Sequence, residues 1–150
     1  MRLARLAFAL PLAAFAAAGC HYASNAVTAD KAWVRLAPVP GRPAAAYVTI
    51  HGGAQPAELI AIDSPAAGSS ELHRSMEMVG GIMQMKRLDS VAVPPRATVA
   101  FAPGGYHVML FGVSPQVKPG DRMPLTLRFA KGDPITVKAR VVAAGDAAPY

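Results

Sequence analysis

Residues 71–88 read ELHRSMEMVGGIMQMKRL, which is two strand-length runs separated at Gly80 and Gly81. A glycine pair between two such runs is typical of a β-hairpin, because glycine adopts the positive φ angles that tight turns require. The sequence therefore predicts strands over 71–78 and 82–88 that are joined by a turn.

The same pattern of short runs, rich in β-branched residues and ended by proline or glycine, continues in both directions. Further strands are expected over 33–36, 46–51, 58–63, 98–101, 106–113, 124–129 and 135–142. The tripeptide Lys131-Gly132-Asp133 predicts a second hairpin between the last two. About eight or nine short strands in 150 residues, with 14 prolines and 13 glycines, predict one all-β domain, a Greek-key β-barrel or sandwich.

The composition excludes several classes of protein. With 53% hydrophobic and 16% charged residues, the chain can bury a core and is not disordered. A single cysteine, Cys20, excludes an intrachain disulfide. Because Cys20 precedes the folded domain, a blue-copper centre within that domain is also excluded, since such a centre needs a thiolate ligand. The net charge of +6 is not arranged as a basic stripe with aromatics, so nucleic-acid binding is not predicted. No Walker A loop, nucleophile elbow or paired carboxylates occur, so no enzymatic activity is predicted.

The N-terminus has the organisation of an export signal. Arg2 and Arg5 precede an apolar segment over 7–18, which is too short to cross a bilayer as a helix. We therefore expect the protein to leave the cytoplasm for a bacterial periplasm.

Two cleavage sites are compatible with this signal. Residues 17–20, AAGC, resemble a lipobox, in which Cys20 becomes the lipidated first residue and the only membrane anchor. The alternative is an ordinary cut after Ala26. With the lipobox, the expected divisions are a signal peptide over 1–19, a flexible leader over 20–29, a β domain over 30–143 that carries the candidate site described next, and a tail over 144–150.

Methionine and histidine gather in one interval of the chain, which is the basis for expecting copper. Five of the six methionines after Met1 and two of the four histidines fall there, namely His73, Met76, Met78, Met83, Met85, His107 and Met109. Valine, isoleucine and leucine define a strand core better than methionine does, so the cluster indicates more than packing. Thioethers and imidazoles together favour Cu(I). The alternative is that these methionines fill irregular gaps in the core.

Alternation along a strand predicts which donors share a face. His107 and Met109 are two residues apart and therefore project together. The turn residues Pro103, Gly104 and Gly105 precede them, which places the pair near the mouth of the barrel.

The predicted hairpin places His73 and the four methionines on opposite faces. A two-residue turn at the glycine pair would set Met78 opposite Met83 and Met76 opposite Met85, with all four on one face. His73 would then lie on the other face. A β-bulge in the first strand, or a longer loop, would remove the conflict between His73 and Met85.

Several stretches of the chain carry a resemblance to a known family, namely AWVR (32–35), AAAY (44–47), SPAAG (64–68), ELH (71–73), GGIMQM (80–85), PGGYHVML (103–110) and GD followed by PLTLRF (120–129). Together they resemble the PCuAC family of periplasmic copper chaperones over residues 33–142. It implies a cupredoxin-like β-barrel, Cu(I) as the bound ion, and transfer of copper to the CuA site of cytochrome c oxidase. The implied partners are cytochrome c oxidase subunit II or another copper chaperone.

The resemblance also implies a set of copper ligands. Carried over by position, they are His73, Met85, His107 and Met109. The family has ten residues between the first histidine and the methionine, then twenty-one before the second histidine, whereas this chain has eleven and twenty-one. The extra residue makes Met83 a neighbouring candidate, with Met76 and Met78 as auxiliary thioethers. The tail over 143–150 contains neither histidine nor methionine, so a Cu(II) site there is not expected.

Two other functions remain open on the sequence. One is a copper-buffering or resistance protein that uses the same site without a dedicated acceptor. The other is a metal-free exported β-domain lipoprotein that serves in adhesion or assembly.

Overall fold

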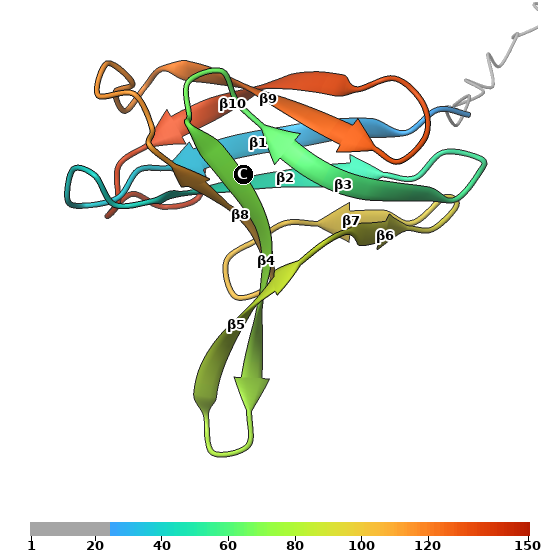
Figure 1. Cartoon of the computed structure of the whole chain (residues 1–150), viewed down its shortest axis with the longest axis horizontal. Helices are drawn as coiled ribbons and strands as arrows, with labels where there is room; N and C mark the ends of the chain where they lie inside the picture. The colour runs from blue at the N-terminus through green and yellow to red at the C-terminus, as the bar shows by residue number, and fades with distance from the viewer. Residues whose placement is uncertain (1–24) are drawn as a thin grey trace, which may run out of the picture.

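A computed structural model of the chain describes residues 25–150, which form strands, turns and loops (Figure 1). The strands are β1 (Thr28–Arg35), β2 (Ala44–His51), β3 (Ala57–Asp63), β4 (Ser69–Met78), β5 (Ile82–Leu88), β6 (Val91–Val93), β7 (Thr98–Ala100), β8 (Tyr106–Phe111), β9 (Arg122–Phe129) and β10 (Ile135–Val142). The all-β prediction is confirmed. The expected signal peptide and the lipidation site at Cys20 lie outside the described residues. Between residues 25 and 150 there is no helix of the length and apolarity needed to cross a membrane.

The strands pair in the order β5-β4-β8-β2-β1-β10-β9-β3-β6, and β7 pairs with β2. The pairing of β1 with β10 is parallel and the other named pairs are antiparallel. Figure 1 shows the hairpin of β4 and β5 extending away from the body formed by the other strands. The predicted hairpins at residues 80–81 and 131–133 both occur.

Two details of the strand prediction differ from the structure. Strand β6 was not predicted, because it has three residues and runs directly into Pro94 and Pro95, too short a run for alternation to be visible. Strand β1 begins at Thr28, before the expected domain start at residue 30, and its pairing with β2 shifts register between Asp30 and Trp33.

The core is built by alternation along the strands. In β9, for example, Met123, Leu125 and Leu127 are buried while the residues between them are not. Each fully buried side chain of this size contributes about 1.5–3 kcal/mol through burial. Strand β5 lies outside this core, and all its residues except Leu88 are exposed.

A smaller cluster outside the main core supports a prediction about pH. Tyr47 stacks on Trp33 with ring centroids 4.3 Å apart, and burial raises the pKa of Tyr47 while the nearby Arg35 partly opposes that rise. The folded state favours the neutral phenol, so the contribution of Tyr47 to the free energy of unfolding is complete below the ordinary tyrosine pKa. This contribution is lost as the pH rises through the higher pKa that Tyr47 has in the folded state.

We expect an ultraviolet titration of the folded protein to contain one late-ionising tyrosine. Tyr47→Phe should remove that late transition, whereas Tyr150→Phe, at an exposed position, should leave it in place. A late transition that persists in Tyr47→Phe would contradict the assignment.

Candidate metal site

The pairing of β4 with β8 brings two histidines together. His73 and His107 lie directly opposite each other in these antiparallel strands. Their ring centroids are 5.7 Å apart and the ring planes are inclined by 46°. His107 is 6% exposed and the His73 side chain is 17% exposed, so both rings are largely shielded from water.

Hydrogen bonds distinguish the two nitrogens of each ring. Nδ1 of His107 lies 3.1 Å from the carbonyl oxygen of Gly105, which can only accept, so Nδ1 carries the hydrogen and Nε2 keeps its lone pair. Nε2 of His73 lies 2.9 Å from Oε2 of Glu71, whereas Nδ1 of His73 is buried and has no hydrogen-bond partner. Each ring therefore presents one nitrogen that is not engaged by a protein partner.

Glu71 connects this pair to the hairpin. Its second oxygen, Oε1, lies 3.4 Å from Nη1 of Arg87. The hydrogen bond with His73 is the main cause that lowers the pKa of Glu71; desolvation opposes it, and the positive charge of Arg87 assists it. Glu71 is therefore a carboxylate, which accepts hydrogen bonds and donates none.

The register of the hairpin differs from the predicted one. Met78 pairs with Ile82, so the loop contains three residues, Val79, Gly80 and Gly81, and the two glycines have φ angles of 90° and 76°. Three-residue loops with glycine at positive φ are a common hairpin connection. The predicted pairs of Met78 with Met83 and of Met76 with Met85 are therefore wrong.

The three-residue loop removes the conflict over His73. Met85 pairs with Ser75, which is two residues from His73, and Met83 pairs with Glu77. Paired residues project to the same face, and so do residues two apart in one strand. Met83 and Met85 are thus on the face of His73, and no bulge is recorded in this pairing.

The other donors divide between the two faces. Met109 pairs with Glu71 and shares the face of His73 and His107. Met76 and Met78 are on the opposite face of the hairpin, paired with Gln84 and Ile82.

The donors on the histidine face differ in exposure. His107 is buried and Met109 is partly buried, whereas Met83 and Met85 are 55% and 61% exposed. The site thus has a shielded side on β4 and β8 and an open side on β5. Residues 25–150 contain no group of three or more histidine, cysteine, aspartate or glutamate side chains arranged to hold a metal ion. The further donors on this face include the thioethers of Met83, Met85 and Met109, and thioethers favour soft ions such as Cu(I).

Sequence reasoning missed the hydrogen bonds of Glu71 and the orphaned nitrogen of His73. The spacing of Glu71 and His73 in the ELH motif could have indicated the first, since residues two apart in a strand share a face. Which oxygen and which nitrogen meet depends on side-chain rotamers, which the spacing does not specify.

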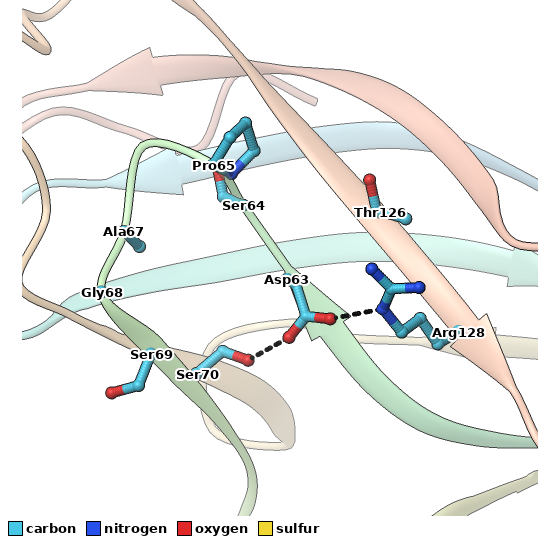
Figure 2. A pocket seen from close by; sticks show the side chains of 9 residues that line it. All are labelled: Asp63, Ser64, Pro65, Ala67, Gly68, Ser69, Ser70, Thr126 and Arg128. Atoms are coloured by element: carbon cyan, nitrogen blue, oxygen red, sulfur yellow. Dashed lines mark hydrogen bonds and ion pairs between the residues drawn. The ribbon is translucent and has the colours of Figure 1, made fainter.

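A pocket of about 550 Å³ is lined by none of the histidines and methionines of this face (Figure 2). There, Asp63 accepts hydrogen bonds from Oγ of Ser70 at 3.0 Å and from Nε of Arg128 at 2.7 Å. Both carboxylate oxygens of Asp63 are therefore already paired within the wall of the pocket.

The sequence is similar to a known family and to a known protein. The sequence profile of the family described as "Putative lipoprotein LpqE-like" matches residues 27–141. A protein of Leifsonia xyli subsp. xyli named "Putative lipoprotein Lxx21020" is 30% identical over 119 residues, which are 78% of this chain and 71% of that protein.

Comparison of the fold with solved structures gives PCuAC domains. The copper-bound PCuAC domain from PmoF2 is 30% identical with a TM-score of 0.63, over 81% of this chain and 97% of that one. CuI-DR1885 from Deinococcus radiodurans is 29% identical with a TM-score of 0.58, over 85% of this chain and 83% of that one. The expected cupredoxin-like β-sandwich is thereby confirmed.

Proposed function

Because the chain belongs to the LpqE-like lipoprotein family and folds like the PCuAC domains, we propose that it is an exported carrier of Cu(I). The observation that carries this proposal is the pair of facing imidazoles on β4 and β8. Each imidazole has one nitrogen hydrogen-bonded to the protein and the other without a protein partner. Two such nitrogens beside thioether sulfurs form a donor set suited to a soft ion.

The proposed ligands are His73, Met85, His107 and Met109, with Met83 as the neighbouring thioether on the same face. Neutral ligands leave bound Cu(I) with a single positive charge, which does not require a deeply buried site. The open side on β5 allows ligands to exchange one at a time, as transfer to a second protein requires. Met76 and Met78, on the opposite face, are not included in this ligand set.

Two neighbours support copper as the cargo. One PCuAC domain was solved with copper bound, and DR1885 was solved in a CuI form. Both exceed 25% identity with this chain and match it over more than four-fifths of its length.

We further propose that the protein is exported, is anchored through Cys20, and delivers copper to cytochrome c oxidase subunit II at its CuA site or to another copper chaperone. A deletion strain tests this route. Loss of oxidase activity at low copper supports delivery, whereas copper sensitivity without loss of oxidase activity would replace delivery by buffering.

The binding proposal has a direct test. The purified chain, without its signal peptide, is titrated anaerobically with Cu(I) in competition with a chromogenic chelator. We expect one equivalent of Cu(I) to be withdrawn from the chelator. A protein that withdraws none is not a Cu(I) carrier, and the metal-free lipoprotein interpretation would then be preferred.

A further inference from the structure

His73 and His107 are held in different ways although they face each other. His107 donates from Nδ1 to the backbone of Gly105, and His73 is bonded at Nε2 by Glu71. The second nitrogen of His73, Nδ1, is buried and unpartnered. A buried polar atom without a partner is unfavourable, so its persistence points to something that binds there.

Glu71 is held in place by two partners at once. Oε2 lies 2.9 Å from Nε2 of His73 and Oε1 lies 3.4 Å from Nη1 of Arg87, which pairs directly opposite His73 in the hairpin. Arg87 thus restrains the carboxylate from the neighbouring strand. Glu71 itself pairs with Met109 on the other side, so it lies among the proposed ligands without needing to be one.

This geometry determines where the imidazole hydrogen of His73 resides. A carboxylate only accepts, so the ring nitrogen facing Glu71 is the one that carries hydrogen. A neutral histidine has one hydrogen on its two nitrogens, which leaves the lone pair on Nδ1. Hydrogen bonds of this kind set the tautomer and the ring orientation of metal-binding histidines.

We infer that Glu71 is a positioning residue that fixes the tautomer of His73, so that His73 binds the metal through Nδ1 while His107 binds it through Nε2. The inference rests on the proposed function for the metal and on the hydrogen bonds of His73 and His107 for the tautomers. The two histidines are therefore not equivalent.

Long-range ¹H–¹⁵N correlation spectra of the ¹⁵N-labelled chain test the tautomers without metal. We expect His73 to carry its hydrogen on Nε2 and His107 on Nδ1. On addition of one equivalent of Cu(I) under anaerobic conditions, the largest ¹⁵N shifts should occur at Nδ1 of His73 and Nε2 of His107. A hydrogen on Nδ1 of His73 in the metal-free protein, or a larger metal-induced shift at its Nε2 than at its Nδ1, would overturn the inference.

Variants of Glu71 separate positioning from mere packing. In Glu71→Ala the His73 tautomers should become mixed, and Cu(I) affinity should fall by roughly 10- to 100-fold, as is usual when an outer partner of a ligand is lost. Glu71→Gln keeps an accepting oxygen and should restore the tautomer and most of the affinity. Glu58→Ala, which removes a carboxylate of β3 that accepts a hydrogen bond from Ser90, should change neither.

The outcomes distinguish this inference from the proposed function. If the unaltered chain does not bind Cu(I), the carrier function and the metal half of the inference both fail. If it binds Cu(I) and Glu71→Ala changes neither tautomer nor affinity, only the role of Glu71 is refuted.

Discussion

Replacing His107 by alanine is expected to lower Cu(I) affinity by about 100-fold or more, because losing a ligand costs at least as much as losing its supporting hydrogen bond. His107 is the most shielded of the proposed donors and pairs directly with His73. Competition with a chromogenic Cu(I) chelator gives the affinity. His51→Ala is the matched control. His51 is the last residue of β2, forms a hydrogen bond with Asp30 of β1 and lies outside the site.

His107 is buried, so His107→Ala leaves a cavity as well as removing a ligand. Met109→Leu tests the same site without a cavity, because leucine keeps an apolar side chain of similar volume and removes only the thioether. Its control is Met123→Leu, the same change at a methionine that is 2% exposed in the core. We expect Cu(I) affinity to fall in Met109→Leu alone. Equal affinity in both leucine variants would remove Met109 from the ligand set.

Replacing Met83 and Met85 together by leucine is expected to weaken Cu(I) binding by roughly tenfold or more, the size of loss seen when supporting groups of a metal site are removed. Both methionines lie on the face of His73, because Met83 pairs with Glu77 and Met85 pairs with Ser75. Leucine keeps an apolar side chain of similar volume and removes the thioether.

The control makes the same change at Met76 and Met78, which pair with Gln84 and Ile82 and lie on the opposite face of the hairpin. Met83 and Met85 are 55% and 61% exposed, so replacing them does not disturb the core. Competition with the chromogenic chelator gives the affinity of each variant. Unchanged Cu(I) affinity after replacement of Met83 and Met85 would show that neither contributes to the site.

Local chemistry was sufficient for much of the fold. Runs of β-branched residues ended by proline and glycine are visible within a few positions, and they predicted the hairpin strands closely. The same approach failed at β6, whose three residues run directly into Pro94 and Pro95, and in counting the hairpin loop. Gly80 and Gly81 indicate a turn but do not exclude Val79 from it, and that single residue decides which methionines face His73.

The sequence by itself determined the short-strand architecture and the kinds of donor atom available, because alternation, turn chemistry and the softness of sulfur and nitrogen are properties of neighbouring residues. Only the tertiary structure decided that β4 lies beside β8, which sets His73 against His107 and leaves one nitrogen of His73 unpaired. The physical reason is that pairing between distant strands is selected by burial of the whole core, and side-chain hydrogen bonds such as that of Glu71 follow from rotamers fixed by that packing.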